Sequence, residues 1–130
     1  MLSQFIAKIL LSIFVMLIFF GCAQSAQRAI LKEKYQNYVY ATNFNTKQIS
    51  AFSIRENPTN GLIEFFLEIS PTSTKQLLYK LEWLDKDNFS LNSIQDDYKM
   101  IQLNDGYVTK IQHSANHKEA KSVKIYLKGN

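Results

Sequence analysis

Several features that would reveal a function are scarce or missing in this chain of 130 residues. It has a single cysteine, so no intramolecular disulfide can form and the core must stabilise the fold unaided. It has two histidines, and no serine lies in a nucleophile-elbow context, so no catalytic constellation is recognisable. The net charge is +4, and the lysines are scattered among acidic residues, which excludes a basic stripe for nucleic acid. The sequence therefore predicts a protein without enzymatic activity, cofactor or nucleic-acid partner.

A long hydrophobic run is missing as well, although the beginning of the chain is strongly apolar. Residues 9–20 carry no charge and follow Lys8, the one charged residue of this part of the chain. A helix of this length extends about 18 Å, well short of the ~30 Å hydrocarbon core of a bilayer. A positive charge, a short apolar segment and then small residues are typical of a secretory signal, and we expect one over residues 1–21.

The only cysteine follows this apolar segment almost directly. Gly21-Cys22-Ala23 resembles the lipobox of bacterial lipoproteins, although Phe19 and Phe20 replace the leucine and the small residue that are more common there. The resemblance implies that Cys22 carries fatty acids such as palmitate, begins the mature protein and holds it to the membrane as a lipid anchor. Ala23, in place of an aspartate, is similar to the sorting signal for the outer membrane. The alternative is an uncleaved signal anchor in which the cysteine is incidental.

Residues 22–37 are rich in alanine, glutamine and lysine. We expect the lipidated cysteine and a tether here, with a short helix over 28–36. A tether of this length, fully extended, reaches about 50 Å, enough to hold a domain clear of the lipid head groups. Residues 38–130 then form one domain, because the chain is too short for two proper cores.

The rest of the chain alternates between apolar and polar residues in short stretches, which is typical of β-strands. In the clearest example Phe65 and Leu67 point to one side, while Glu64 and Glu68 point to the other. Turn signals separate the stretches, for example Asn-Pro-Thr-Asn-Gly at 57–61. We expect strands over 38–44, 49–55, 62–69, 77–85, 89–94, 99–103, 107–112 and 122–128. Seven or eight short strands without a long helix predict an all-β fold, an antiparallel β-sandwich, with a barrel as the alternative.

The stretch 77–85 contains the only tryptophan and is the centre of the predicted fold. Alternation places Leu77, Tyr79, Leu81 and Trp83 on one side, and a wall of this kind needs a second sheet to cover it.

The run Tyr-Lys-Leu-Glu-Trp-Leu-Asp at 79–85 is the most recognisable motif of the chain. Together with residues 61–84, 103–107 and 123–127, it resembles the YcfL-like family of bacterial outer-membrane lipoproteins over about two-thirds of the mature chain. Asn88 departs from that pattern, since a turn glycine is common there. The resemblance implies an immunoglobulin-like sandwich with an accessory role in the cell envelope. Its motifs are structural and imply no active site.

Two groups of residues resemble metal sites only in part. His113 and His117 are four positions apart, which would place them on one face of a helix, but we expect them on a loop with only Glu119 nearby. Asp85 and Asp87 are similar to the start of a calcium loop, but the glycine and the distal glutamate of such a loop are missing. The sequence therefore favours a polar loop and a solvated turn, without a bound metal.

Four apolar residues are expected on outward faces: Leu62 and Phe66 in one strand, Leu78 and Leu84 in another. They form one patch if the two strands are a hairpin, and two smaller patches if the strands lie on opposite sheets. Single exposed apolar residues are common, so ordinary surface, or cover by a loop or the tether, is the plain alternative. Our hypothesis is a surface that binds a partner protein or a second copy of the chain, with Leu78 and Leu84 as its centre. We expect most tyrosines and phenylalanines beyond the signal to lie in the core.

These features together predict a lipid-anchored protein of the bacterial outer membrane, facing the periplasm or the cell exterior. Its domain would act as a protein-binding or accessory module. One alternative is a surface-exposed adhesin that binds host components, which protease treatment of whole cells would reveal. An alternative of another class is an envelope hydrolase or a metal-handling protein, for which metal analysis would be the first test.

Overall fold

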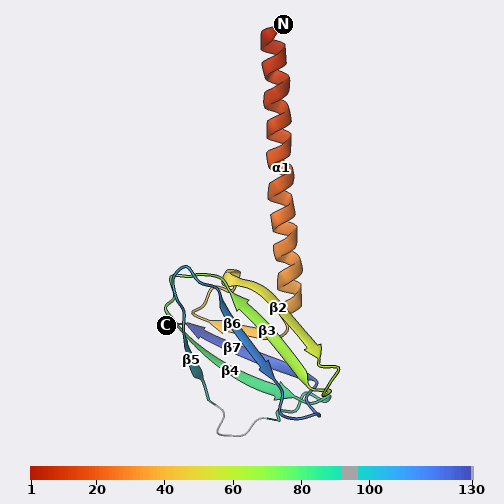
Figure 1. Ribbon diagram of the computed structural model, residues 1–130, viewed down its shortest axis with the longest axis vertical. Coiled ribbons are helices and arrows are strands. Elements are labelled where there is room, and N and C mark those ends of the chain that lie inside the picture. Colours follow the sequence, from red (N-terminus) through yellow and green to blue (C-terminus); the bar gives the residue numbers. More distant parts are fainter. Residues whose placement is uncertain (92–96, 130) are drawn as a thin grey trace. The chain divides into compact units, whose positions relative to one another are not determined.

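The computed structural model describes residues 1–91 and 97–129, without the side chains of residues 17–23. The chain divides into two compact units, Met1–Glu33 and Lys34–Asn130. Almost all of the first unit belongs to one helix, and the second contains the strands (Figure 1).

Helix α1 (Leu2–Tyr35) contains both the predicted signal and nearly all of the predicted tether. We expected a short helix only over 28–36, whereas the helix runs through the tether as far as Tyr35. The residues after the apolar segment explain the difference, because alanine, glutamine, lysine, arginine and glutamate all favour helix. Among the described residues, no helix combines the length and the apolar character that are needed to cross a membrane.

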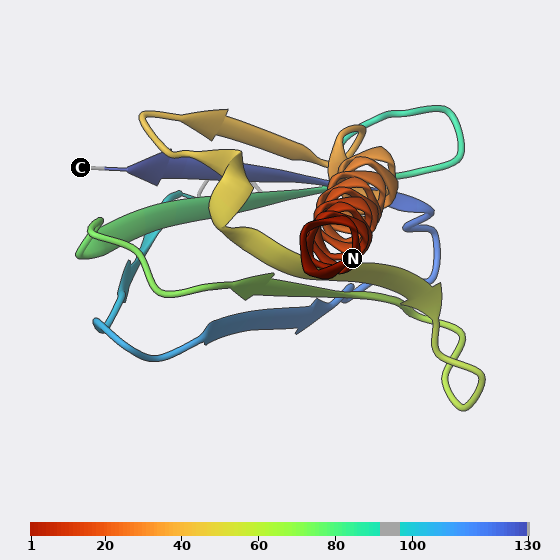
Figure 2. The same cartoon turned by 90° about the horizontal axis from the view of Figure 1, so that it is seen from above.

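The second unit is a β-sandwich with two layers, which Figure 2 shows one above the other. The strands of the described residues are β1 (Val39–Thr42), β2 (Ile49–Glu56), β3 (Ile63–Ile69), β4 (Gln76–Leu84), β5 (Lys99–Gln102), β6 (Thr109–Ser114) and β7 (Ser122–Gly129), with a short 3₁₀ helix, η1 (Thr46–Gln48), before β2. One sheet has four strands in the order β1-β7-β4-β5, and the other has three in the order β2-β3-β6. The predicted fold class, a β-sandwich of seven or eight short strands, is confirmed for the second unit.

The connectivity has two features that alternation alone does not reveal. β1 is an edge strand that pairs with β7 in parallel, whereas the other strand pairs are antiparallel. The first and last strands are therefore neighbours, while in an immunoglobulin constant domain the first strand pairs with the second. β4 lies inside its sheet, between β7 and β5, which agrees with the central place predicted for it.

The core forms where the inward sides of the two sheets meet. From the three-stranded sheet, β3 contributes Phe65, Leu67 and Ile69, and from the four-stranded sheet β7 contributes Val123 and Ile125, all almost fully buried. Burial of each such side chain contributes about 1.5–3 kcal/mol. The alternation read from the sequence assigned these residues correctly, because each strand buries one side only.

β4 is less regular than its pattern suggested. Leu77 and Tyr79 are buried, while Leu81 and Trp83, on the same side, are only half-buried. Trp83 nevertheless faces the other sheet, since its ring centroid lies 6.0 Å from that of Phe65.

Leu84, which we expected on the outer surface, is only 4% exposed, so that prediction was wrong. At the end of β4 the backbone of Leu84 is paired twice. Its carbonyl accepts a hydrogen bond from the amide of Lys121, and Leu84 forms an isolated bridge with Ser90. Of the strand expected over 89–94, residues 89–91 form no strand apart from this bridge, and 92–94 lie outside the described residues.

The turns follow the sequence signals closely. Gly61 has a φ of +70°, as the Asn-Gly pair predicted. Asn88 has a φ of +64°, so the asparagine adopts the left-handed conformation in which a glycine is more common.

Candidate functional site: the outer face of the four-stranded sheet

A row of four side chains crosses the outer face of the four-stranded sheet. Alternation turns Tyr40 of β1, Tyr126 of β7 and Lys80 of β4 outward, because the other side of each strand packs in the core. The register places Tyr40 opposite Tyr126, and Tyr126 opposite Lys80. Tyr98 continues the row, since it immediately precedes Lys99, the residue at which β5 begins to pair with β4.

Contacts within the row connect its members in pairs. The rings of Tyr40 and Tyr126 stack with their centroids 5.7 Å apart, and the Nζ atom of Lys80 lies 6.0 Å from the centroid of the Tyr98 ring. Tyr40 is 45% exposed and Tyr98 41%. Partial burial, followed by the negative charge of Glu82, raises the pKa of Tyr126 above its usual value of 10.0. The row is therefore an aromatic surface that is ordered by its own contacts and open to solvent.

An apolar pair extends this surface along the sheet. Leu78 of β4 lies opposite Met100 of β5, on the same side as Lys80. Met100 is 62% exposed and Leu78 is half-buried. We call the whole surface the tyrosine face; it consists of Tyr40, Leu78, Lys80, Tyr98, Met100 and Tyr126.

The charges on this side of the sheet are mainly positive. Lys124 and Lys128 flank Tyr126 along β7, and Lys80 belongs to the tyrosine face itself. Glu82 is the only acidic residue in the four strands, and one of its carboxylate oxygens lies 4.0 Å from the Nζ atom of Lys124. Three lysines against one glutamate leave a charge of +2 on the outer face.

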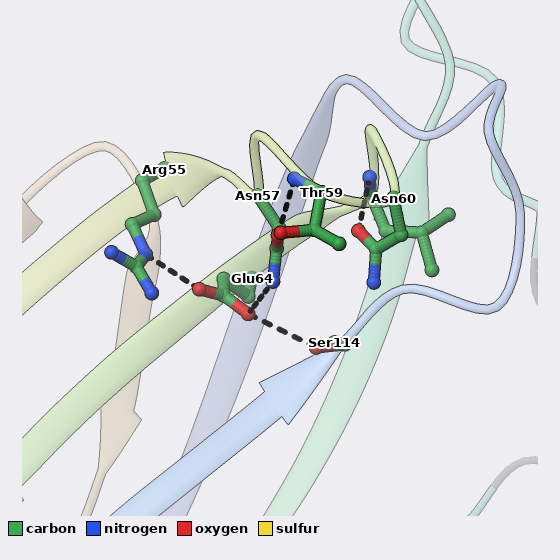
Figure 3. A network of polar contacts seen from close by, with 7 residues as sticks. Arg55, Asn57, Thr59, Asn60, Glu64 and Ser114 are labelled. Carbon is green, nitrogen blue, oxygen red and sulfur yellow. Dashed lines mark hydrogen bonds and ion pairs between the residues drawn. The ribbon is translucent and has the colours of Figure 1, made fainter.

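The outer face of the three-stranded sheet differs, because Arg55 and Lys110 balance the charges of Glu64 and Glu68 there. Glu64 of β3 accepts hydrogen bonds from Arg55, from the Asn57 side-chain amide at 3.4 Å and from the Ser114 hydroxyl at 3.4 Å (Figure 3). The bond from Arg55 is the main reason that the pKa of Glu64 is lowered from its usual 4.5. A hollow of about 220 Å³ lies beside this network and is shallow. This face therefore offers less uncompensated charge to a partner than the tyrosine face does.

The four apolar residues predicted to form a partner surface separate in the fold. Leu78 belongs to the tyrosine face, whereas Leu84 is buried and leaves the surface altogether. Leu62 and Phe66 lie on the other sheet and are half-buried, with the Nζ atom of Lys110 at 5.9 Å from the centroid of the Phe66 ring. The residues therefore lie on opposite sheets, the second of the two arrangements considered. Cys22, the predicted site of lipidation, lies within α1.

The two histidines lie in different environments. His113 points into the sandwich from β6, where its Nε2 atom lies 3.1 Å from the hydroxyl of Tyr79, and its ring lies 6.0 Å from that of Phe65. Burial, and then the charge of Lys99, lower the pKa of His113 from its usual 6.5. His117 is exposed, and no group of three or more potential ligands of a metal ion exists among the described residues. In the structure, His113 therefore serves as a contact between the two sheets.

In the turn after β4, an acidic side chain accepts hydrogen bonds from backbone amides. One carboxylate oxygen of Asp85 accepts hydrogen bonds from the amides of Asp87, at 2.8 Å, and Phe89, at 2.9 Å. Hydrogen bonds between an aspartate and the backbone amides of its own turn are common in turns. They are in line with the solvated turn that the sequence favoured over a calcium loop.

The assignment of most tyrosines to the core does not hold for Tyr40, Tyr98, Tyr107 and Tyr126. A signal existed for Tyr126, because alternation in the last strand places it on the same side as Lys124 and Lys128. Tyr98 gave no such signal, since it precedes its strand and joins the row only through the pairing of β5 with β4.

Comparison with known proteins supports the fold and leaves the function open. The model of a family described as "Protein of unknown function (DUF1425)" matches residues 36–129. The crystal structure of Campylobacter jejuni cj0090 is similar with a TM-score of 0.65 and 28% identity, over 72% of this chain and 99% of that one. A DUF1425 family member from Shewanella sp. pv-4 is similar with a TM-score of 0.50 and 17% identity, over 61% of this chain and 73% of that one, and shows the fold alone. No curated protein is similar enough to the sequence to count as a match.

Proposed function

Since the chain belongs to the DUF1425 family, whose function is unknown, we propose a function from its own surfaces: a non-enzymatic lipoprotein of the bacterial cell envelope that binds a partner protein through the tyrosine face. In this proposal it is a YcfL-like lipoprotein of the outer membrane, acylated at Cys22. The β-sandwich is the binding module.

The composition of the tyrosine face is the observation that carries the proposal. Tyrosine and methionine are enriched at protein interfaces, and tyrosine is common among the residues that contribute most to binding. A single exposed apolar residue needs no explanation, but here Tyr40, Tyr98 and Met100 are all strongly exposed on one side of one sheet. A flat sheet with such side chains suits another macromolecule better than a small ligand, which requires a concave site.

The anchor is supported by the arrangement at the end of the apolar segment. Residues 9–20 are followed by Gly21 and Cys22, and two or more acyl chains on the cysteine would hold the protein to a membrane stably. Anchoring confines the sandwich to the membrane surface, where a weak contact with a neighbouring protein gains from a high effective concentration.

The test is site-specific photo-cross-linking in living cells. A photo-reactive residue at position 98 or 100 should form a discrete protein adduct, while the same residue at position 112, on the outer face of the other sheet, should not. The triple variant Tyr40→Ser, Tyr98→Ser and Leu78→Ser, with the probe at 100, should lose the adduct and retain its thermal unfolding midpoint to within a few degrees. Adducts of equal yield at 98, 100 and 112, or an adduct that survives the triple variant, would contradict the proposal.

A further inference from the structure

Lys80 of the tyrosine face and Lys128, which lies beside this face, have no acidic partner within the part of the chain that the structure describes. Lys80 contacts the ring of Tyr98, and Lys128 is exposed at the end of β7. The ion pairs of Arg55 with Glu64 and of Lys124 with Glu82 use other cations.

The register places these two lysines diagonally across neighbouring strands. Lys80 lies opposite Tyr126, and Lys128 lies opposite Leu78, so the four residues form the corners of one small square of the sheet. Diagonal neighbours on one face are roughly 7–8 Å apart and within reach of long side chains. Like charges at this distance repel each other, and an anion between them would relieve that repulsion.

The surroundings make this position favourable for an anion when the face is covered. Leu78 and Met100 on one side, and Tyr126 on the other, would exclude water from the contact. A charge pair screened from water is stronger than an exposed one, although its desolvation must be offset by good geometry.

A second copy of the chain is disfavoured as the partner of this surface. Two identical faces related by a two-fold axis would bring a patch of charge +2 against another of the same sign, which disfavours association. An acidic partner meets no such repulsion.

We propose that the protein bound by the tyrosine face presents an acidic segment, with a carboxylate of aspartate or glutamate between Lys80 and Lys128 and apolar side chains over Tyr98 and Met100. This inference rests on the proposed function and adds the chemistry of the partner. It assigns to the lysines the choice of partner, and to the tyrosines and the methionine most of the contact area.

The experiment uses the full-length chain in cells with the photo-reactive residue at position 100. The variant with Lys80→Gln and Lys128→Gln should reduce the yield of the protein adduct by about tenfold, corresponding to the loss of roughly 1.4 kcal/mol of binding. The matched control, with Lys110→Gln and Lys118→Gln, removes the same charge from other exposed positions and should keep the wild-type yield. Mass spectrometry of the wild-type adduct should place an aspartate or glutamate within a few residues of the cross-linked position in the partner.

A charge exchange completes the test. Lys80→Glu with Lys128→Glu should abolish the adduct, and replacement of the identified acidic residue of the partner by lysine should restore it. If the lysine variants keep the adduct while the triple variant loses it, the proposed function stands and the acidic partner is wrong. If no protein adduct forms at position 98 or 100 in the wild type, both are wrong. An adduct with lipid or glycan in place of protein would also overturn the acidic-protein proposal.

Discussion

Gly129 marks the place where the end of β7 passes the bend after β1 at close range. A Cβ atom on this glycine would lie 2.1 Å from the carbonyl oxygen of Asn43 and 3.0 Å from its carbonyl carbon. Asn43 has a φ of +51°, in the left-handed region, and Gly129 pairs with the fully buried Leu77. Neither backbone can move aside without disturbing the sheet, so glycine is required at this position for its lack of a side chain.

We therefore expect Gly129→Ala to lower the free energy of unfolding by about 1–3 kcal/mol or more, the usual cost of overpacking. Chemical denaturation of the purified full-length chain measures the change. Lys128→Ala, at the exposed neighbouring position, is the control and should change stability by no more than about 0.5 kcal/mol. Equal midpoints for Gly129→Ala and the wild type would mean that the two segments are not in close contact.

The difference between Gly61 and Gly129 shows what single residues reveal in a sequence. The positive φ at Gly61 was predictable, because the Asn-Gly pair is a local signal of a turn. The close approach at Gly129 was not, because it depends on a segment far away in the chain that is brought near by the parallel pairing of β1 with β7.

Among the elements, β4 and β6 belong to different sheets and meet through one polar contact inside the sandwich. The hydroxyl of Tyr79 lies 3.1 Å from the Nε2 atom of His113, and their ring centroids are 5.7 Å apart. Burial, and then the charge of Lys99, lower the pKa of His113 from 6.5. The unfolded chain, in which the histidine has its ordinary pKa, therefore binds a proton at a higher pH than the folded protein does.

The sign of the pH dependence follows from this difference. Stability from the neutral His113 is complete above about pH 6.5 and is lost as the pH falls through that value toward the lower pKa of the folded state. In a His117→Gln variant His113 is the only histidine. We expect the thermal unfolding midpoint of this variant to decrease as the pH is lowered from 7.5 to 5.5. In a His113→Gln variant the midpoint should change less over the same range. The same decline in both variants would show that other groups cause it.

Alternation predicted the strands well and their surroundings less well. It identified β3, β4 and β7 and their buried sides, because a strand in a sandwich has one inward face along its whole length. It failed at Leu84, the last residue of β4, which is buried although alternation places it on the outward side. For the candidate site it identified Leu78. The row of tyrosines was missed, because a row across four strands depends on register, which a single strand's pattern does not contain.

At the scale of the whole molecule, the helical tether changes how far the sandwich can be held from a lipid anchor. The helix from Cys22 to Tyr35 rises 1.5 Å per residue and is about 20 Å long, whereas an extended tether would reach about 50 Å. In the proposed lipoprotein, removal of residues 1–21 would divide α1 and leave this shorter helix between the anchor and β1. The partner of the tyrosine face would then lie near the membrane surface.

This picture depends on acylation of Cys22, which has a direct test. The thiol is the only group of the chain that can form the thioether bond to a lipid, so we expect Cys22→Ala to abolish labelling by radioactive palmitate. The variant should also accumulate as a slower-migrating precursor, because processing of a lipoprotein signal follows lipidation of its cysteine. Ser25→Ala, three positions further along the same helix, should be labelled and processed like the wild type. Labelling that persists in Cys22→Ala would contradict acylation of Cys22. A wild-type chain that is neither labelled nor shortened would show that residues 1–21 act as an uncleaved anchor and that the full helix remains in the protein.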